Sequence, residues 1–234
     1  EYLKKIQSSS ALMMTIINQV LEMARIESGT ATLRLKAEDL SAIFHDVSSV
    51  FESDIRKKNL QYLIDTDICH KYAICDKTKL QEIYLNIVSN AVKYTPAGGS
   101  LHIEVSQEKS SIRGRQKYIF KCSDTGIGMS QEFLDKLFQP FERAKDSTIS
   151  RIAGTGLGMA ITRNLIDLMN GDITVESEPG KGSVFTASIP LETQDARQED
   201  IPEEWLGVHS LIVDDDRQTC LNAVELLEDM GLRA

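Results

Sequence analysis

The first 28 residues carry apolar side chains in a helical pattern. From Leu3 to Val20 the apolar positions recur at spacings of three, four and seven, which is typical of an amphipathic helix. Gly29 follows them and is a residue type that commonly ends a helix. A single helix of this length leaves its apolar stripe uncovered. It therefore either packs on its own domain or forms one arm of a helical bundle with helices from elsewhere.

After residue 31, short alternating or apolar runs replace the long helical stripe. Alternation with β-branched and aromatic residues predicts strands, and apolar spacings of three and four predict helices. Residues 124–157 are predicted to be mainly loop. The predicted strands are 32–35, 60–65, 72–75, 101–107, 118–123, 172–178 and 183–190, and the predicted helices are 40–59, 76–92 and 158–169.

The order of these elements predicts the fold class. Strands and helices are interleaved, but the last two strands are joined across a hairpin turn at 179–182 (Pro-Gly-Lys-Gly). Hairpins make antiparallel pairs, which disfavours a doubly wound parallel sheet. We therefore expect an α+β fold: a two-layer α/β sandwich with a mixed, largely antiparallel sheet and helices on one face, preceded by the long bundle helix.

The composition changes after the last predicted strand. Residues 193–207 are acidic and aperiodic, which is typical of a linker. A short apolar run at 208–213 follows, which we predict to be a strand, and three aspartates from Asp214 to Asp216 come directly after it. The chain therefore divides into a helix at 1–29, a main domain at 32–192, the linker, and the start of another domain at 208–234.

Charge and cysteine content narrow the function classes. A net charge of −9 over 234 residues argues against nucleic acid as a partner, because phosphate binding needs a basic surface. Cys69, His70 and Cys75 lie close together, but no second ligand pair has zinc-site spacing, so we expect reduced thiols in a cytoplasmic setting. No apolar run reaches about 18 residues and no signal peptide opens the chain. Membrane attachment would come only from segments outside it.

Three polar residues fall on one face near the end of the predicted helix 76–92. Asn86 and Asn90 are four residues apart, and Lys93 lies almost one turn further along the same side. An amide oxygen suits Mg²⁺, and a lysine ammonium suits phosphate. Two asparagines on a helix are equally compatible with an ordinary solvent-facing surface, so this pattern needs others beside it.

Two glycine-rich turns flank regular elements. Asp124, followed by Gly126 and Gly128, stands at the end of a predicted strand, where its carboxylate could accept a hydrogen bond from an adenine amino group. Residues 154–158 (Gly-Thr-Gly-Leu-Gly) lead into the last predicted helix and could present backbone N–H groups to phosphates. This turn lacks the closing Gly-Lys-Ser/Thr of a Walker loop, and either turn alone is weak evidence.

A long polar stretch lies between these two turns. From Phe138 to Arg151 it is predicted to be a mobile lid, with aromatic anchors at one end and arginines available for a γ-phosphate. The final hairpin turn is glycine-rich, and Thr186 lies on the strand after it, where we expect it to line a base pocket.

The order of these motifs resembles a known family. The chain carries, in sequence, Asn-x-x-x-Asn-Ala-x-Lys-Tyr, Asp-x-Gly-x-Gly, Phe-x-Pro-Phe, Gly-Thr-Gly-Leu-Gly and Gly-x-Gly-Ser-x-Phe. This set resembles the N, G1, F, G2 and last glycine boxes of sensor histidine kinases, which belong to the gyrase-like ATPase superfamily. The resemblance covers roughly residues 36–192.

The resemblance implies a role for each matching residue in binding ATP and Mg²⁺. Asn90 would hold Mg²⁺ with Asn86 supporting it, and Arg143 would reach the γ-phosphate from the closed lid. The implied nucleotide-binding residues are Lys93 and Tyr94 at the phosphates, Asp124, Gly126 and Gly128 at the adenine, Gly154, Thr155, Gly156, Leu157 and Gly158 around the phosphate tail, and Thr186 in the base pocket.

The flanking segments resemble the same family. Residues 23–29 (Met-Ala-Arg-Ile-Glu-Ser-Gly) resemble the end of the second helix of the dimerisation and phosphotransfer bundle, which implies a homodimer. None of the four histidines has the His-Glu-x-x-Arg setting of the phosphoacceptor, so we expect this chain to be unable to phosphorylate itself. The aspartates at 214–216 resemble the start of a response-regulator receiver domain, which implies a hybrid kinase.

We therefore expect a histidine kinase catalytic domain. It would pass the γ-phosphoryl of ATP to a histidine on a bundle helix outside this chain, and from there to a receiver aspartate. Two alternatives are a non-catalytic nucleotide-binding module and an ATP hydrolase of the same superfamily. The hydrolysing relatives carry a glutamate base at the position of Asn86. An amide cannot accept that proton, which favours phosphoryl transfer.

Overall fold

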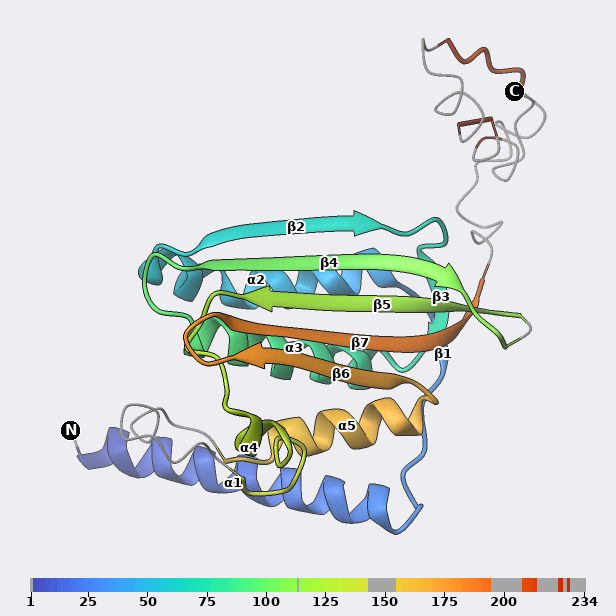
Figure 1. The fold of residues 1–234 in the computed structure, drawn as a ribbon. Helices are drawn as coiled ribbons and strands as arrows, with labels where there is room; N and C mark the ends of the chain where they lie inside the picture. The colour runs from blue at the N-terminus through green and yellow to red at the C-terminus, as the bar shows by residue number, and fades with distance from the viewer. Residues whose placement is uncertain are drawn as a thin grey trace.

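The computed structural model describes residues 2–112, 114–142, 155–194 and 208–213, together with residues 223, 224 and 227. Within these residues, a long helix precedes a sheet that is covered by helices (Figure 1). The elements in chain order are α1 (Tyr2–Glu27), β1 (Lys36–Asp39), α2 (Leu40–Lys58), β2 (Gln61–Asp67), β3 (Tyr72–Cys75), α3 (Lys77–Tyr94), β4 (Ser100–Lys109), β5 (Arg115–Asp124), α4 (Gln131–Leu134), α5 (Gly158–Leu168), β6 (Asp172–Glu178) and β7 (Gly182–Thr193).

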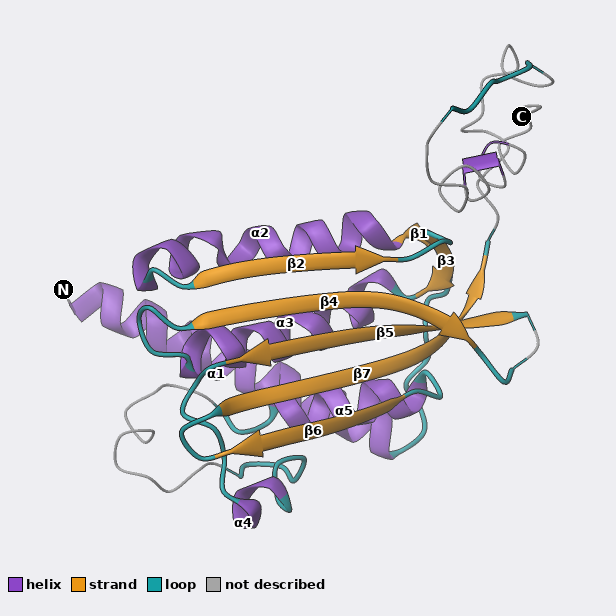
Figure 2. Cartoon of the chain, turned by 45° about the horizontal axis from the view of Figure 1, so that its top comes forward, coloured by secondary structure: helices purple, strands orange, loops and turns teal. Residues whose placement is uncertain are grey.

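The described strands form one mixed sheet. Their order is β1-β3-β7-β5-β4-β2, and β6 also pairs with β7. The pairs are antiparallel except for β2 with β4, which is parallel. Figures 1 and 2 agree that α2, α3 and α5 lie on the same face of this sheet. The expected α+β sandwich with a largely antiparallel sheet is confirmed.

The core lies between the helices and the sheet. Alternate residues of β5 point to the helices, and Tyr118, Phe120 and Cys122 are buried there. Phe120 stacks on Tyr84 of α3 with ring centroids 4.3 Å apart, and Phe44 of α2 lies 5.1 Å from Tyr84. Aromatic clusters of this kind bury large apolar areas in a defined geometry. The core therefore holds α3, which carries the predicted polar face, rigidly against the sheet.

Each of the two helices α2 and α3 begins at an aspartate. Asp39 accepts hydrogen bonds from the backbone N–H groups of Ser41 at 2.8 Å and Ala42 at 3.2 Å. Asp76 accepts from the N–H of Lys79 at 3.1 Å. These side chains satisfy N–H groups that the first turn of a helix leaves unpaired. The helix starts predicted near residues 40 and 76 are confirmed.

The strand predicted at 32–35 is wrong, because none of these four residues is in a strand. Strand β1 begins instead at Lys36, which pairs with Cys75 of β3. The N–H of Arg34 donates to the Asp76 carboxylate at 2.8 Å, so it serves the cap of α3 rather than a sheet neighbour. Alternating polarity shows that a segment suits a strand, but it does not show where its ladder partner begins.

Helix α1 packs on the domain with one face only. Met23 and Ile26 contact the core, while Met13, Ile17 and Leu21 are exposed. The first alternative for this helix, packing on its own domain, therefore holds for one face and leaves an apolar face open. None of the described helices combines the length and the apolar character needed to cross a membrane.

The two described buried cysteines, Cys75 and Cys122, are protonated thiols of low reactivity. Burial raises the pKa of the Cys75 thiol to about 12 and also raises that of Cys122, so both stay protonated at neutral pH. Cys69 is exposed. Within the described part of the chain, no group of three or more histidine, cysteine or acidic side chains is arranged to hold a metal.

Residues 208–213 do not form the predicted strand. Apart from one bridge position at His209 they have no strand structure, and Leu211 and Val213 are 90% and 84% exposed. An apolar segment becomes a strand only where it gains ladder partners and cover for its side chains. The linker residues 195–207 and the aspartates at 214–216 lie outside the described residues.

Candidate functional site

A cavity of about 330 Å³ opens between α3, α5 and the turns around them. It joins the elements that carry the sequence motifs. Its described lining consists of Gln19, Asn86, Ser89, Asn90, Lys93, Tyr94, Asp124, Ile127, Gly128, Met129, Phe133, Leu137, Glu142, Thr155, Gly156, Gly158, Met159, Ser183 and Phe185.

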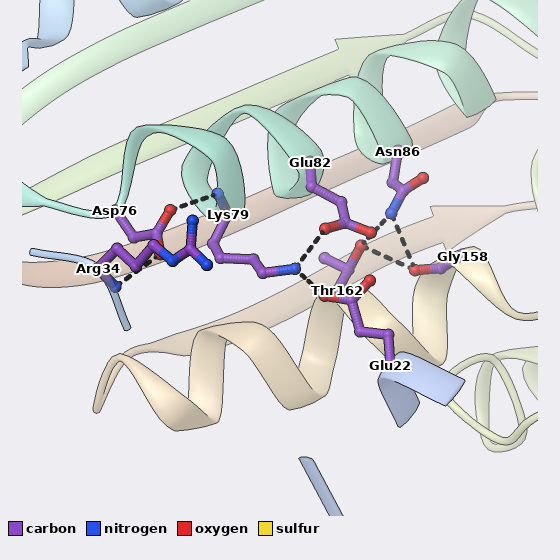
Figure 3. A network of polar contacts seen from close by, with 8 residues as sticks. All are labelled: Glu22, Arg34, Asp76, Lys79, Glu82, Asn86, Gly158 and Thr162. Atoms are coloured by element: carbon purple, nitrogen blue, oxygen red, sulfur yellow. Dashed lines mark hydrogen bonds and ion pairs between the residues drawn. The ribbon is translucent and has the colours of Figure 1, made fainter. Parts of the chain in front are cut away.

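Helix α3 supplies the polar wall of this cavity. Asn86, Asn90 and Lys93 all line it, as their helical spacing predicts. The amide nitrogen of Asn86 donates to the backbone oxygen of Gly158 and to the hydroxyl of Thr162, both at 3.3 Å (Figure 3). Asn86 therefore fixes the start of α5 against α3, next to Asn90.

Asp124 supplies a buried acceptor at the end of β5. Its side chain is 9% exposed, and the N–H of Gly126 donates to it at 2.8 Å. Burial raises the pKa of Asp124, and the backbone N–H groups of Gly126 and Ser183 partly oppose this rise. A carboxylate with a second oxygen in a cavity is a strong acceptor for an amino group of a ligand.

Glycines allow three chain segments to converge at this carboxylate. A Cβ on Gly126 would lie 2.8 Å from the backbone oxygen of Tyr94. Gly128 has φ +65°, and a Cβ there would overlap the backbone of Glu178 at the end of β6. Side chains at either position would force apart the end of α3, the turn after β5 and the final hairpin.

The second glycine-rich turn forms the other end of the cavity. Thr155, Gly156 and Gly158 line it, whereas Leu157 is fully buried in the core. The backbone oxygen of Gly156 accepts from the N–H of Phe141 at 3.0 Å. The turn therefore leads into the N-terminus of α5, where backbone N–H groups favour anions. Gly154 lies outside the described residues.

The predicted lid is described only in its first part. Phe138 packs against the core, and the guanidinium of Arg163 lies 5.9 Å from its ring centre. Phe141 is 63% exposed, so of the two expected aromatic anchors only Phe138 is one. Arg143 and the rest of the segment to residue 154 lie outside the described residues.

Thr186 does not line the cavity. Ser183 and Phe185 do, and successive side chains of a strand point to opposite faces. Thr186 therefore lies on the face of β7 away from the helices, opposite Lys121 and Thr174 of the neighbouring strands. The predicted place of Thr186 in a base pocket is wrong by one strand position.

The sequence prediction missed most of the apolar wall. Part of this wall comes from α4, in a segment expected to be mainly loop. The spacing of Phe133, Leu134, Leu137 and Phe138, after the helix-capping Ser130, was the available signal. The apolar lining residues are Ile127, Met129, Phe133, Leu137, Met159 and Phe185.

The sequence also missed four polar lining residues. Ser89 and Ser183 stand inside the Asn-x-x-x-Asn and last glycine motifs, but no role was predicted for them. Glu142 follows the Phe-x-Pro-Phe motif, and Gln19 comes from the opening helix. These last two belong to no recognisable pattern. Together, the cavity offers an apolar slot with one buried carboxylate and a polar end with amides, a lysine and a helix N-terminus. This arrangement suits a nucleotide, with its base in the slot and its phosphates at the polar end.

Comparisons with known proteins agree with this chemistry. The family model for histidine kinase-, DNA gyrase B-, and HSP90-like ATPases matches residues 75–193. The circadian input-output histidine kinase CikA of Synechococcus elongatus is 30% identical over 237 residues, which cover 100% of this chain and 31% of CikA. The aerobic respiration control sensor protein ArcB of Escherichia coli is 33% identical over 239 residues, which cover 99% of this chain and 30% of ArcB.

Solved structures show the same fold. Full-length ShkA, solved in complex with AMPPNP, superimposes with a TM-score of 0.70 at 24% identity, over 100% of this chain and 47% of that one. The catalytic domain of histidine kinase ThkA has a TM-score of 0.55 at 27% identity, over 69% of this chain and 99% of that one. The chain thus spans less than a third of either curated relative. It belongs to the histidine kinase-, DNA gyrase B-, and HSP90-like ATPase family, and within it to the catalytic domains of sensor histidine kinases.

Proposed function

We propose that this chain is the ATP-binding catalytic part of a hybrid sensor histidine kinase. It would pass the γ-phosphoryl of ATP to a histidine on a bundle helix, and a receiver aspartate would take it next. One observation carries this proposal: a single cavity joins the buried Asp124 carboxylate to Asn90 and Lys93 on α3. That combination matches a purine amino group at one end and phosphates at the other.

The phosphate end holds residues suited to ATP and Mg²⁺. Asn90 lines the cavity and can offer one amide oxygen, while phosphates and waters complete the six oxygen ligands that Mg²⁺ prefers. The bound ion would neutralise phosphate charge. The Lys93 ammonium lies 5.2 Å from the centre of the Tyr94 ring, and both residues line the same wall. They would orient the phosphates for transfer.

The geometry of Asn86 supports transfer over hydrolysis. Its amide donates to the Gly158 oxygen and the Thr162 hydroxyl, so it acts as a positioning group between α3 and α5. A water-activating base must accept a proton, which an amide cannot do. Nothing in the described lining other than Asp124 and Glu142 carries a carboxylate, and Asp124 is committed to the turn at Gly126.

The flanking segments extend this proposal to the whole protein. The exposed face of α1 would join a homodimeric helical bundle, and the residues from 208 onward would begin a receiver domain. Reduced cysteines and a net charge of −9 favour a cytoplasmic catalytic domain with no nucleic-acid role. ArcB and CikA are themselves named as a sensor protein and a histidine kinase.

The test is phosphotransfer between two chains. This chain is mixed with γ-labelled ATP and a longer chain that carries the acceptor helix but has its own Asn90→Ala substitution. Acid-labile, base-stable label on the longer chain is the expected result. Asn90→Ala in this chain should abolish it, because the Mg²⁺ ligand is lost. Gln81→Ala on the same helix lies outside the cavity and should leave it unchanged.

Two other outcomes would favour the alternatives. If Mg·ATP binds but no label appears, the chain is a nucleotide-binding module. Sustained phosphate release without any acceptor chain would identify an ATP hydrolase. The chain alone should show neither histidine labelling nor steady release.

A further inference from the structure

The opening helix contributes a side chain to the nucleotide cavity. Gln19 of α1 lines the cavity beside Thr155, although 136 residues separate the two in the sequence. The Thr155 hydroxyl donates to the side-chain oxygen of Gln19 at 3.0 Å. The same hydroxyl accepts from the N–H of Leu157 at 3.3 Å. Thr155 therefore links α1 to the turn that opens α5.

A second contact lies one turn further along α1. Glu22 forms an ion pair with Lys79 of α3, and Lys79 also pairs with Glu82 at 3.2 Å. Figure 3 shows Lys79 between the two carboxylates. All three side chains are less than 30% exposed. Because Gln19 and Glu22 are three residues apart, they share one face of α1.

These two contacts hold α1 to both helices of the phosphate end. Gln19 reaches the start of α5, and Glu22 reaches α3 two turns before Asn86. Asn86 in turn bonds the first residue of α5. A shift of α1 away from the domain would therefore remove one wall group from the cavity and release the turn at Thr155.

We propose that α1 completes the nucleotide site, with Gln19 as a binding residue supplied by the opening helix. Nucleotide affinity then depends on whether α1 is docked, and by linkage a bound nucleotide strengthens docking by the same factor. This inference rests on the proposed function, because it takes the ligand to be Mg·ATP. It makes the bundle helix a sensor of nucleotide occupancy as well as a scaffold.

The first test is calorimetric titration of the 234-residue chain with Mg·AMPPNP. Gln19→Ala should weaken binding by about three- to tenfold, the range of one hydrogen bond at a partly buried site. Asn18→Ala removes an amide from the neighbouring position of α1, outside the cavity, and should change affinity by less than about twofold. Equal affinities for Gln19→Ala and the wild type would overturn the proposal.

The second test separates docking from direct contact. Glu22→Gln leaves the cavity lining intact and weakens only the contact with Lys79. It should lower affinity by about two- to fivefold in the wild type and have no further effect in the Gln19→Ala background. Independent, additive effects in the double variant would contradict coupling through docking.

Amide hydrogen exchange supplies a readout that a folding defect does not imitate. Adding Mg·AMPPNP should slow exchange across residues 18–26 in the wild type and leave it unchanged in Gln19→Ala. If Mg·AMPPNP binds the wild type but does not change the exchange rates in α1, the inference is overturned and the proposed function still stands. If the wild-type chain does not bind Mg·AMPPNP at all, both the inference and the proposed function are overturned.

Discussion

At the scale of single residues, Asp124 combines burial, an acceptor contact within its own turn and a place in the cavity lining. One carboxylate oxygen takes the N–H of Gly126 at 2.8 Å, and the side chain borders the cavity. Burial raises its pKa above the usual 3.8 because it disfavours the charged form. In the proposed function the carboxylate is ionised when it accepts from both the turn and a base amino group, so its titration should be visible in binding.

Asp124→Asn should weaken Mg·AMPPNP binding by at least about tenfold. An amide offers one acceptor oxygen where the carboxylate offers two, and hydrogen bonds to charged groups are the stronger ones. Wild-type affinity should also fall as the pH drops through the raised pKa of Asp124, and the variant should lack this component. Calorimetric titration at several pH values measures both effects. Equal affinity of the two chains at neutral pH would contradict the role.

The same substitution should have the opposite effect on stability. Because the folded pKa of Asp124 is raised, its contribution to the free energy of unfolding is fully present below the unfolded pKa and is lost as the pH rises through the folded pKa. Asp124→Asn should therefore gain stability over the wild type near neutral pH, and the gain should shrink on acidification. Urea unfolding across this pH range tests the sign. A gain that grows toward low pH would show it to be wrong.

Lys58 holds the end of the helix that carries the site. Its ammonium donates to the backbone oxygens of Val92, Lys93 and Thr95 at 2.7, 3.0 and 2.9 Å. These carbonyls belong to the C-terminal end of α3, where a cation is favourable to the helix dipole. The three N–H groups of the Lys58 ammonium thus fix the backbone at Lys93, whose side chain lines the cavity.

Lys58→Met should lower the free energy of unfolding by about 2 kcal/mol, because it removes charged hydrogen bonds to these carbonyls. Lys57→Met is the matched control: its side chain is 71% exposed and pairs only with Asp54 among the described residues, so about 0.5 kcal/mol or less is expected. Urea unfolding monitored by circular dichroism gives both values. Similar losses for the two variants would refute a special role for Lys58.

Sequence reasoning located Asp124 and the Asn86 to Lys93 face but missed Lys58 and Gln19. The first group stands in short patterns whose geometry is local, namely a strand end before glycines and a helical spacing of four and three. Lys58 is the last of three consecutive basic residues and looks like any of them. Its role depends on which helix end folds against it, which no local pattern specifies.

At the scale of elements, the two helix caps differ in environment. Asp76 is 6% exposed and accepts from the N–H groups of both Lys79 and Arg34, so it joins the cap of α3 to the segment after α1. Asp39 caps α2 in a more open setting. Removing a buried acceptor leaves its donors unpaired, whereas water replaces an exposed one.

Asp76→Ala should therefore cost about 2–3 kcal/mol of unfolding free energy, and Asp39→Ala about 1 kcal/mol. Chemical denaturation of the two variants beside the wild type measures the difference. A larger loss for Asp39→Ala would mean that the Arg34 contact does not contribute. Nucleotide binding should change little in the second variant, because Asp39 lies outside the cavity lining.

Helices with strong periodicity and caps were predictable, and short elements were not. The errors at residues 32–35 and at α4 share one cause. A four-residue element gains most of its stability from tertiary neighbours, so its position follows from packing rather than from its own pattern. Pairing with β3 sets the start of β1 at Lys36. Packing against the cavity sets the position of α4, which begins at Gln131.

At the scale of the whole molecule, α1 presents one face to the domain and leaves the opposite face exposed. At 100° per residue, Gln19 and Glu22 project toward the domain, while Ile17 and Val20 lie on the far side. The domain-facing side makes the contacts at Thr155 and Lys79. The far side is apolar and exposed, and its large residues are Met13, Met14, Ile17, Val20 and Leu21.

The chain should self-associate through this far face of α1. Ile17→Glu should shift it to a monomer, because a charge in an apolar helix interface is costly. Asn18→Glu places the same charge beside the stripe rather than in it and should leave association unchanged. Light scattering after gel filtration gives the mass of each. A wild-type chain that stays monomeric at high concentration would rule out this role for the face.

The sequence by itself determined the long helices, most of the strands, the fold class and the polar face of α3. These features follow from spacings within one element and from the capping residues at its ends, and such interactions act over a few residues. The tertiary structure alone decided that Gln19 enters the cavity, that Thr186 does not, and that Asp124 is buried. Each of these depends on how distant elements pack and in which register strands pair. A one-position shift in a strand reverses which side chains face the site.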